Sequence, residues 1–192
     1  MRKLITKMSM SIDGFVSTVD GQNDWIFKTV DKESTAWSVG LSREAGLIIM
    51  GRKSFEVMTS YWPTATGPFA APMNEIPKAV FTQKGFKIPP SASSSPAAVS
   101  WAEARVFDGD LAEGIKQLKQ EPGKHIVAAG GAGFMRSLIA TGLIDEYHLA
   151  FHPIALGAGL PIFSSLTKPL DLKLVAVKTF SGGIAVHTYH PA

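Results

Sequence analysis

The sequence predicts an α/β protein built on a mixed sheet. Short apolar runs typical of buried strands alternate with segments whose apolar residues recur at helical spacing. Glycines end two of these runs, and each is followed at once by a helix start. The last two strand-like segments, residues 170–180 and 184–189, flank a Ser-Gly-Gly turn and predict an antiparallel hairpin that closes the sheet.

The first half begins with a predicted strand over residues 3–10 and a loop rich in Asp, Gly and Asn over residues 13–25. Asp31 is placed to cap a helix whose Trp37, Leu41 and Ala45 recur every four residues. Further elements are predicted from short runs: strands at 47–50 and 78–82, a helix at 54–58, and a surface loop at 89–98.

The second half repeats the alternation more clearly. Asp110 and Glu113 form a capping-box pair before a helix whose apolar stripe holds Leu111, Ile115 and Leu118. After it come a strand at 125–129, a short helix ended by Gly142, and a strand at 147–154.

Composition excludes several classes of protein. The 192 residues fit one domain, and the absence of cysteine excludes disulfides, cysteine-ligated zinc, iron–sulfur clusters and thiol nucleophiles. This fits a cytoplasmic protein. The 19 basic and 16 acidic side chains are interspersed, so no nucleic-acid partner is expected. Residues 147–167 lack charged side chains, but their histidines, prolines and glycines indicate a strand and a loop, not a membrane span.

Two turns could hold a phosphate. Gly51-Arg52-Lys53-Ser54 and Gly130-Gly131-Ala132-Gly133 each follow a predicted strand and open a helix, where free N–H groups and the helix dipole favour an anion. Either turn alone is equally explained as a plain strand end. Together they favour a phosphate-bearing ligand at the carboxyl ends of the strands. The dinucleotide fingerprint is absent, because Arg136 stands where its third glycine belongs.

A set of short motifs occurs in one order along nearly the whole chain: Ser11-Ile12-Asp13-Gly14-Phe15, Asp24-Trp25, Met50-Gly51-Arg52-Lys53-Ser54-Phe55-Glu56, Tyr61-Trp62, Pro77-Lys78-Ala79-Val80-Phe81-Thr82, Gly130-Gly131, Gly142-Leu143-Ile144-Asp145-Glu146 and Leu156-Gly157-Ala158-Gly159. The ordered set resembles the dihydrofolate reductase-like superfamily. Its most similar branch contains the reductase domain of riboflavin biosynthesis and small stand-alone relatives.

The resemblance implies a three-layer fold with a mostly parallel sheet and NADPH as hydride donor. It assigns the phosphate end of the cofactor to Gly51, Arg52, Lys53 and Ser54, the adenosine ribose to Thr82, and the pyrophosphate to Gly130, Gly131, Ala132, Gly133 and Phe134. Arg52 and Lys53 also suit the 2′-phosphate of NADPH. Family relatives commonly dimerise, and the uncharged 147–167 segment adds to the expectation of a homodimer.

On the substrate side the resemblance points to Asp13, which could supply or relay a proton; a simple turn aspartate is the alternative. Trp25, Tyr61 and Trp62 could wall a flat heterocycle or merely cover the core. Folate reduction is not expected, since Val30 occupies the position of the pterin-binding carboxylate. Histidines four apart at 148 and 152 lie in a predicted strand, so no metal site is expected.

Two functions follow from these observations. The first is an NADPH-dependent reductase of the riboflavin-biosynthesis type, which transfers a hydride to a small heterocyclic, carbonyl or imine substrate. The alternative is a non-catalytic nucleotide-binding or oligomerising module on the same fold.

Overall fold

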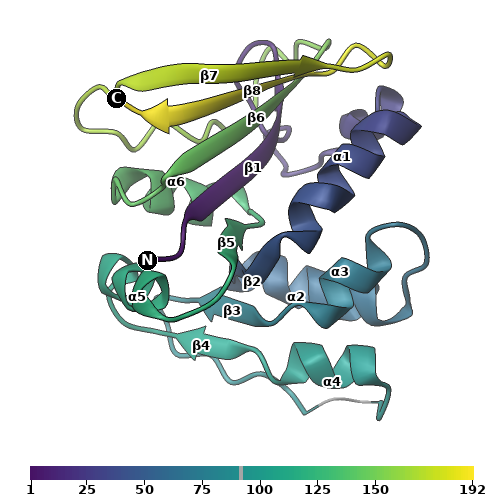
Figure 1. Ribbon diagram of the computed structural model, residues 1–192, viewed down its shortest axis with the longest axis vertical. Coiled ribbons are helices and arrows are strands. Elements are labelled where there is room, and N and C mark those ends of the chain that lie inside the picture. Colours follow the sequence, from purple (N-terminus) through teal and green to yellow (C-terminus); the bar gives the residue numbers. More distant parts are fainter. Residues whose placement is uncertain (91–92) are drawn as a thin grey trace.

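An eight-stranded mixed sheet forms the centre of the protein, with the strand order β4-β3-β2-β5-β1-β6-β8-β7 (Figure 1). The computed structural model describes residues 1–90 and 93–192. The strands are β1 Leu4–Ser11, β2 Ala45–Gly51, β3 Lys78–Phe81, β4 Arg105–Phe107, β5 His125–Ala128, β6 Glu146–His152, β7 Leu172–Thr179 and β8 Ala185–Pro191.

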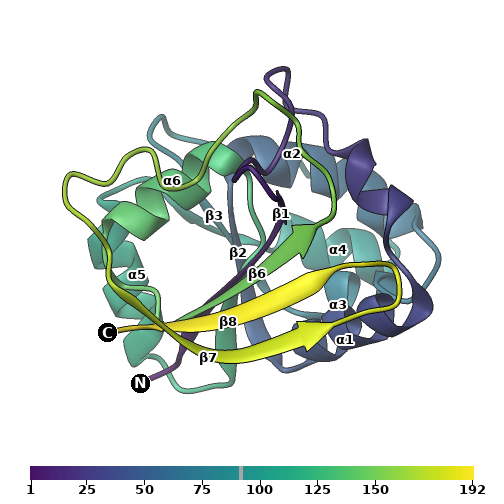
Figure 2. The ribbon, with the colours of Figure 1, turned by 90° about the horizontal axis from the view of Figure 1, so that it is seen from above.

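The six strands from β4 to β6 are parallel; β8 runs antiparallel to β6, and β7 runs antiparallel to β8. β8 lies between β6 and β7, so the hairpin joins the sheet through its second strand (Figure 2). The mixed sheet and the closing hairpin are therefore as the sequence predicts.

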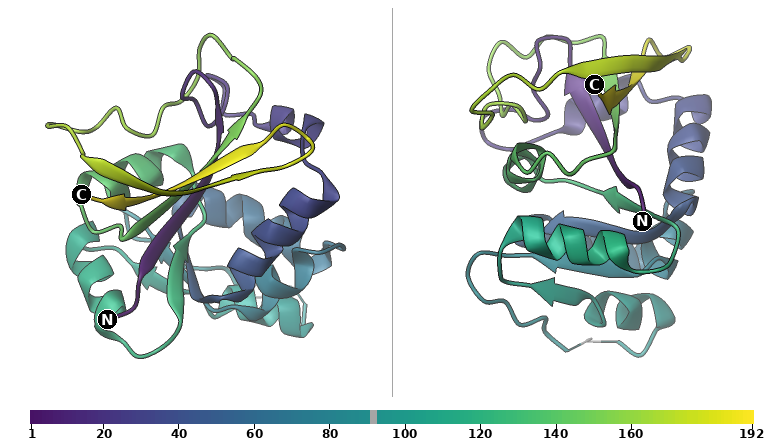
Figure 3. Two further views of the ribbon diagram at one scale, coloured as in Figure 1. Left: turned by 45° about the horizontal axis from the view of Figure 1, so that its top comes forward. Right: turned by 60° about the vertical axis from the view of Figure 1, so that its left-hand side comes forward.

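Helices cover both faces of the sheet, which confirms the three-layer arrangement (Figure 3). One layer contains α1 Lys32–Arg43, α2 Arg52–Tyr61, α3 Ala70–Glu75 and α4 Pro96–Ala102; the other contains α5 Leu111–Gln120 and α6 Ala132–Ala140. Two short 3₁₀ helices, η1 Asp24–Lys28 and η2 Trp62–Thr64, complete the fold. In the part of the chain that the structure describes, no helix is both long and apolar enough to cross a membrane.

Some sequence predictions were wrong in detail. Ala45 begins β2 and is not part of the preceding helix, which ends at Arg43. The predicted loop at 89–98 already becomes α4 at Pro96, because Ser95 caps that helix; residues 91 and 92 lie outside the described part. The short elements η1, α3, α4 and β4 were not predicted, since fewer than two helical turns or four strand residues carry little periodicity.

Asp31 joins the start of α1 to the C-terminal hairpin. Its Oδ1 accepts the Ser34 N–H, so Asp31 caps α1 as the sequence predicts, and the Ser34 hydroxyl accepts the Asp31 N–H in return. The Asp31 Oδ2 accepts the N–H of Gly182 and the hydroxyl of Ser181. These hydrogen bonds, led by that of the Ser34 backbone, lower the pKa of the Asp31 carboxyl. The hairpin turn approaches so closely that a Cβ on Gly182 would overlap the carbonyl oxygen of Thr29.

We therefore expect Gly182→Ala to lower the free energy of unfolding by about 1–3 kcal/mol, because backbone must move to admit the methyl group. Urea unfolding measures the effect. Gly109→Ala is the matched control, since a Cβ there meets no atom within 4 Å. Equal stabilities of the two variants would contradict the close packing of turn and helix.

Candidate functional site

The two glycine turns meet at one edge of the sheet. They follow β2 and β5, which are adjacent parallel strands, so their carboxyl ends lie side by side. The Gly51 N–H donates to the Gly130 carbonyl oxygen over 3.4 Å, and the Gly131 N–H donates to the Ser54 hydroxyl oxygen over 2.8 Å. The structure thus joins the two turns that the sequence analysis singled out into one surface.

The close packing of these turns explains a glycine requirement. A Cβ on Gly51 would lie 2.8 Å from the Cβ of Phe134, so only glycine lets α6 begin this close to the end of β2. Phe134 in turn stacks on Phe81, the last residue of β3, at a centroid distance of 5.6 Å. Thr82 follows β3 directly, and its N–H donates to the Phe107 carbonyl oxygen.

Positive charge and two helix N-termini gather at this edge. α2 begins at Arg52 and α6 at Ala132, and both first turns present backbone N–H groups with no acidic residue among them. Lys53 is exposed, whereas Arg52 forms an ion pair with Glu56 over 2.8 Å and is 40% exposed. These residue types fit a dinucleotide phosphate, because two helix N-termini, a serine hydroxyl and two cations belong to the two joined turns and the helix starts that follow them.

β1, the strand next to β5 in the sheet, lines a cavity of about 260 Å³. It opens between β1, β6 and β8 on one side and η1 and α1 on the other, and the hairpin turn region closes one end. Its lining residues are Lys7, Ser9, Ile26, Phe27, Val30, Ser34, Thr35, Trp37, Ser38, Phe69, Ala150, His152, Phe180, Ile184 and Val186.

Lys7 is the charged side chain of this cavity, and the sequence analysis did not predict it as a site residue. Burial lowers the pKa of its ammonium group to about 8. Thr6 pairs with Ala128 near the end of β5, so Lys7 and Ser9 stand at the level where the second glycine turn begins. A ligand that extends from that turn across β1 would therefore reach them.

A signal for Lys7 was present in the sequence. The strand reads Leu-Ile-Thr-Lys-Met-Ser-Met-Ser, in which polar residues alternate with methionines over its second half. Such alternation is typical of a strand with one polar face. The structure puts Met8 and Met10 against the core, while Lys7 and Ser9 line the cavity on the other face.

His152 lies deep in the same cavity as a neutral ring. It is 1% exposed, and desolvation together with the nearby charge of Lys7 lowers its pKa to about 4. Its Nδ1 shares a hydrogen bond of 2.7 Å with the Thr29 hydroxyl. Trp25 packs edge-on against the imidazole at a centroid distance of 5.3 Å.

Asp13 takes a different place from that expected of a proton donor. It does not line the cavity; its carboxylate accepts the N–H groups of Leu156 and Gly157 over 2.7–3.1 Å. A hydrogen bond from Ser11 and these two N–H groups lower the pKa of the Asp13 carboxyl. Asp13 therefore holds the 156–157 loop next to the end of β1, and its part in a reaction stays a prediction.

The three aromatic residues proposed as a wall do not gather in one place. Trp25 is buried against His152, and its Nε1 has no hydrogen-bond partner within the described residues. Tyr61 and Trp62 lie at the end of α2, where their rings are in contact and Tyr61 is exposed. Neither of the latter two lines the cavity, so their role toward a substrate stays a prediction.

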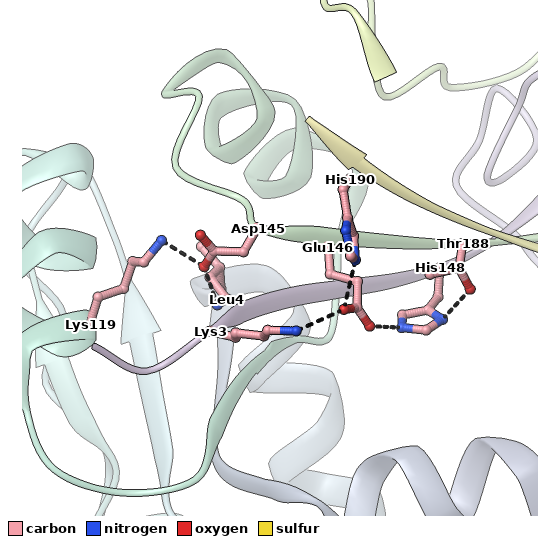
Figure 4. A network of polar contacts seen from close by, with 8 residues as sticks. All are labelled: Lys3, Leu4, Lys119, Asp145, Glu146, His148, Thr188 and His190. Carbon is pink, nitrogen blue, oxygen red and sulfur yellow. Dashed lines mark hydrogen bonds and ion pairs between the residues drawn. The ribbon is translucent and has the colours of Figure 1, made fainter. Parts of the chain in front are cut away.

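A wider hollow of about 470 Å³ between β4 and α5 is less suited to an anionic ligand, because Asp108, Asp110 and Glu113 line it. Two other histidines, His148 and His190, belong to a network at the start of β6, where Glu146 accepts hydrogen bonds from Lys3 and from both rings (Figure 4). Thr188 contacts the second ring nitrogen of His148. That network stands at the opposite end of the strand from His152.

The sheet order, the paired glycine turns and the adjacent cavity define an α/β protein of the dihydrofolate reductase-like class. The family model described as the RibD C-terminal domain matches residues 2–186. The chain belongs to this family.

Individual relatives agree with that assignment. The chain is 30% identical over 189 residues to the uncharacterized protein YyaP of Bacillus subtilis (strain 168), covering 98% of this chain and 95% of YyaP. A putative riboflavin biosynthesis protein from Shewanella sp. PV-4 shares the fold with a TM-score of 0.78 at 20% identity, over 99% of both chains.

The chain also matches a solved structure from Thermotoga maritima, a diaminohydroxyphosphoribosylaminopyrimidine deaminase/5-amino-6-(5-phosphoribosylamino)uracil reductase. The TM-score is 0.68 at 16% identity, over all of this chain but 57% of that longer protein. At this identity the match shows a shared fold.

The neutral state of His152 predicts a loss of stability in acid. Its folded-state pKa of about 4 lies below the unfolded value, so its contribution is complete above pH 6.5 and is lost as the pH falls through 4. From pH 7 to pH 4, the free energy of unfolding should therefore decrease by up to ~3 kcal/mol more in the wild type than in the His152→Gln variant. Urea titrations at both pH values measure this, and parallel losses in the two proteins would contradict it.

Proposed function

We propose that the protein is an NADPH-dependent reductase that transfers a hydride to a small carbonyl, imine or heterocyclic acceptor. The observation that carries the proposal is that two joined glycine turns follow β2 and β5, while the next strand, β1, lines a small cavity that contains one lysine. Membership in the RibD C-terminal domain family supports it, because this fold serves a 5-amino-6-(5-phosphoribosylamino)uracil reductase in Thermotoga maritima.

On the cofactor side, Gly51, Arg52, Lys53 and Ser54 would hold one phosphate end, and the turn at 130–134 would hold the pyrophosphate against the start of α6. Thr82 would lie beside the adenosine ribose. When bound, NADPH supplies the hydride. The protein's part is to orient the donor across the end of β5 toward the cavity, and to exclude water there.

Lys7 is the group best placed to supply the proton. It lines the cavity, and its pKa of about 8 keeps most of it protonated at neutral pH yet able to release the proton. Asp13, by contrast, has a lowered pKa and is ionised. We therefore assign Asp13 to positioning of the loop that follows β6. The sequence analysis placed Asp13 on the substrate side, but it does not line the cavity; the reductase proposal over the non-catalytic alternative is therefore supported by Lys7 in that cavity.

Arg52→Ala should weaken NADPH binding by about 10- to 100-fold and NADH binding by much less, because a charge-assisted contact to the 2′-phosphate is lost. Fluorescence quenching titrations with both nucleotides measure this. Arg136→Ala is a control arginine that is not assigned to the site. Equal losses for NADPH and NADH would refute the placement of the phosphate end at Arg52.

The proton donor is identified by a pair of variants. Lys7→Met should lower turnover of any carbonyl acceptor that wild type reduces by about 10²–10³-fold, with NADPH affinity unchanged. Wild-type turnover should fall as the pH rises through about 8, where Lys7 loses its proton. Asp13→Asn weakens the hold on the 156–157 loop but leaves Lys7 in place, so it should lower turnover by about 10²-fold through mispositioning and keep this alkaline limb. Loss of the limb in Asp13→Asn and its persistence in Lys7→Met would reverse the two assignments.

We also propose a homodimer, for a different reason than the 147–167 segment. Residues 147–150 of that segment are buried within this chain by β1 and β8. The exposed apolar surface is instead on β7, an edge strand whose Leu174, Val175 and Val177 are 48%, 44% and 52% exposed. Such an edge is a ready surface for a second copy.

Sedimentation at several concentrations should give a molecular mass of about twice the 20.6 kDa of one chain. Val177→Glu should shift the measured mass toward that of the monomer. Val19→Glu is the control, since Val19 is 68% exposed on a loop far along the chain from β7. A wild-type monomer at high concentration would refute the dimer.

A further inference from the structure

The lining of the cavity carries very little charge. Within the residues that line it there is one cation, Lys7, one neutral imidazole, His152, and no carboxylate. The two carboxylates adjacent in sequence to lining residues are both engaged elsewhere: Asp31 with Ser34 and the hairpin turn, and Glu33 with Lys178. A charged substrate would therefore find at most one counterion.

The remaining lining is mainly apolar and includes four aromatic rings from four separate segments. Phe27 belongs to η1, Trp37 to α1, Phe69 precedes α3, and Phe180 precedes the hairpin turn. Rings on several sides favour a flat apolar body, since aromatic pairs are stabilised by offset and edge contacts. Hydroxyl groups of Ser9, Thr35 and Ser38 add uncharged hydrogen-bonding capacity.

Size restricts the ligand further. A volume of about 260 Å³ is below the range of roughly 300–1,000 Å³ that is usual for drug-sized ligands. A sugar phosphate joined to a heterocycle would need more room and further cations or free N–H groups for the phosphate. Burial of an unpaired anion among apolar side chains is costly.

Resting on the proposed reductase function, we infer that the substrate is a compact, uncharged aromatic aldehyde or ketone rather than a phosphorylated sugar derivative. The hydride with its electron pair adds to the carbonyl carbon, and the π pair moves to the oxygen. That oxygen takes the proton of the Lys7 ammonium group, which yields an alcohol, oxidised NADP⁺ and a neutral amine that regains a proton from water. The aromatic body rests among Phe27, Trp37 and Phe180.

Binding of product-like probes to the cofactor-free protein tests the class of ligand apart from turnover. 4-Nitrobenzyl alcohol, which cannot form an imine with Lys7, should bind at least about tenfold more tightly than the anionic 4-(hydroxymethyl)benzoate in calorimetry. Phe27→Ser should lower the affinity for 4-nitrobenzyl alcohol about fivefold, because the variant lacks an exposed aromatic ring that lines the cavity. Val57→Ser is the matched control, as Val57 is 69% exposed and does not line the cavity.

Turnover supplies the second arm. With NADPH, 4-nitrobenzaldehyde should be reduced with a kcat/KM at least about tenfold above that of 4-carboxybenzaldehyde, and ribose 5-phosphate should not be reduced. NADPH binding with preferential reduction of ribose 5-phosphate, or tighter binding of the benzoate than of the alcohol, would overturn the substrate class while the reductase function stands. Absence of NADPH binding would overturn the reductase function, and the calorimetric arm would still decide the class of ligand.

Discussion

The pairing of β1 between β5 and β6 is the constraint on which the rest of the structure depends. Thr6 is held opposite Ala128 on one side and Tyr147 on the other. With both neighbours parallel, the side chains of β1 must alternate between two faces. One face completes the apolar layer under α5 and α6, and the other presents Lys7 and Ser9. A shift of one residue would exchange core methionines for a lysine, so the register is strongly specified.

This strand also separates two chemical environments. On the β5 side, glycine turns, helix N-termini and the cations of α2 form a surface suited to anions. On the β6 side, rings and aliphatic side chains surround a single ammonium group. A hydride donor bound on the β5 side and an acceptor bound on the β6 side would meet across β1. A nucleotide bound at the glycine turns, as proposed, would keep its charge out of the cavity, where Lys7 has no carboxylate among the lining residues.

Much of the fold and the anion surface could be predicted from local sequence. Gly51 and Gly130 mark the ends of apolar runs, Asp31 and Asp110 are effective caps, and each signal spans only a few residues. The substrate side could not be predicted in this way. The residues that line the cavity come from segments as far apart in sequence as Lys7 and Val186. Only tertiary packing shows that the Asp13 carboxylate binds the backbone of the 156–157 loop, whereas Lys7 lines the cavity. Tyr61 and Trp62 are aromatic residues of the type that could wall a flat heterocycle, but they lie at the end of α2 and do not line the cavity.

The insertion of β8 between β6 and β7 has a consequence for the order in which the protein can assemble during synthesis. β7 leaves the ribosome before β8 but cannot join the sheet until β8 has paired with β6. The glycine turns at 51 and 130 involve only strands made earlier, so a nascent chain could complete the anion surface first. Phe180, Ile184 and Val186 arrive with the hairpin. A translating chain would thus complete the surface formed by the two glycine turns before the cavity lined by the hairpin is closed.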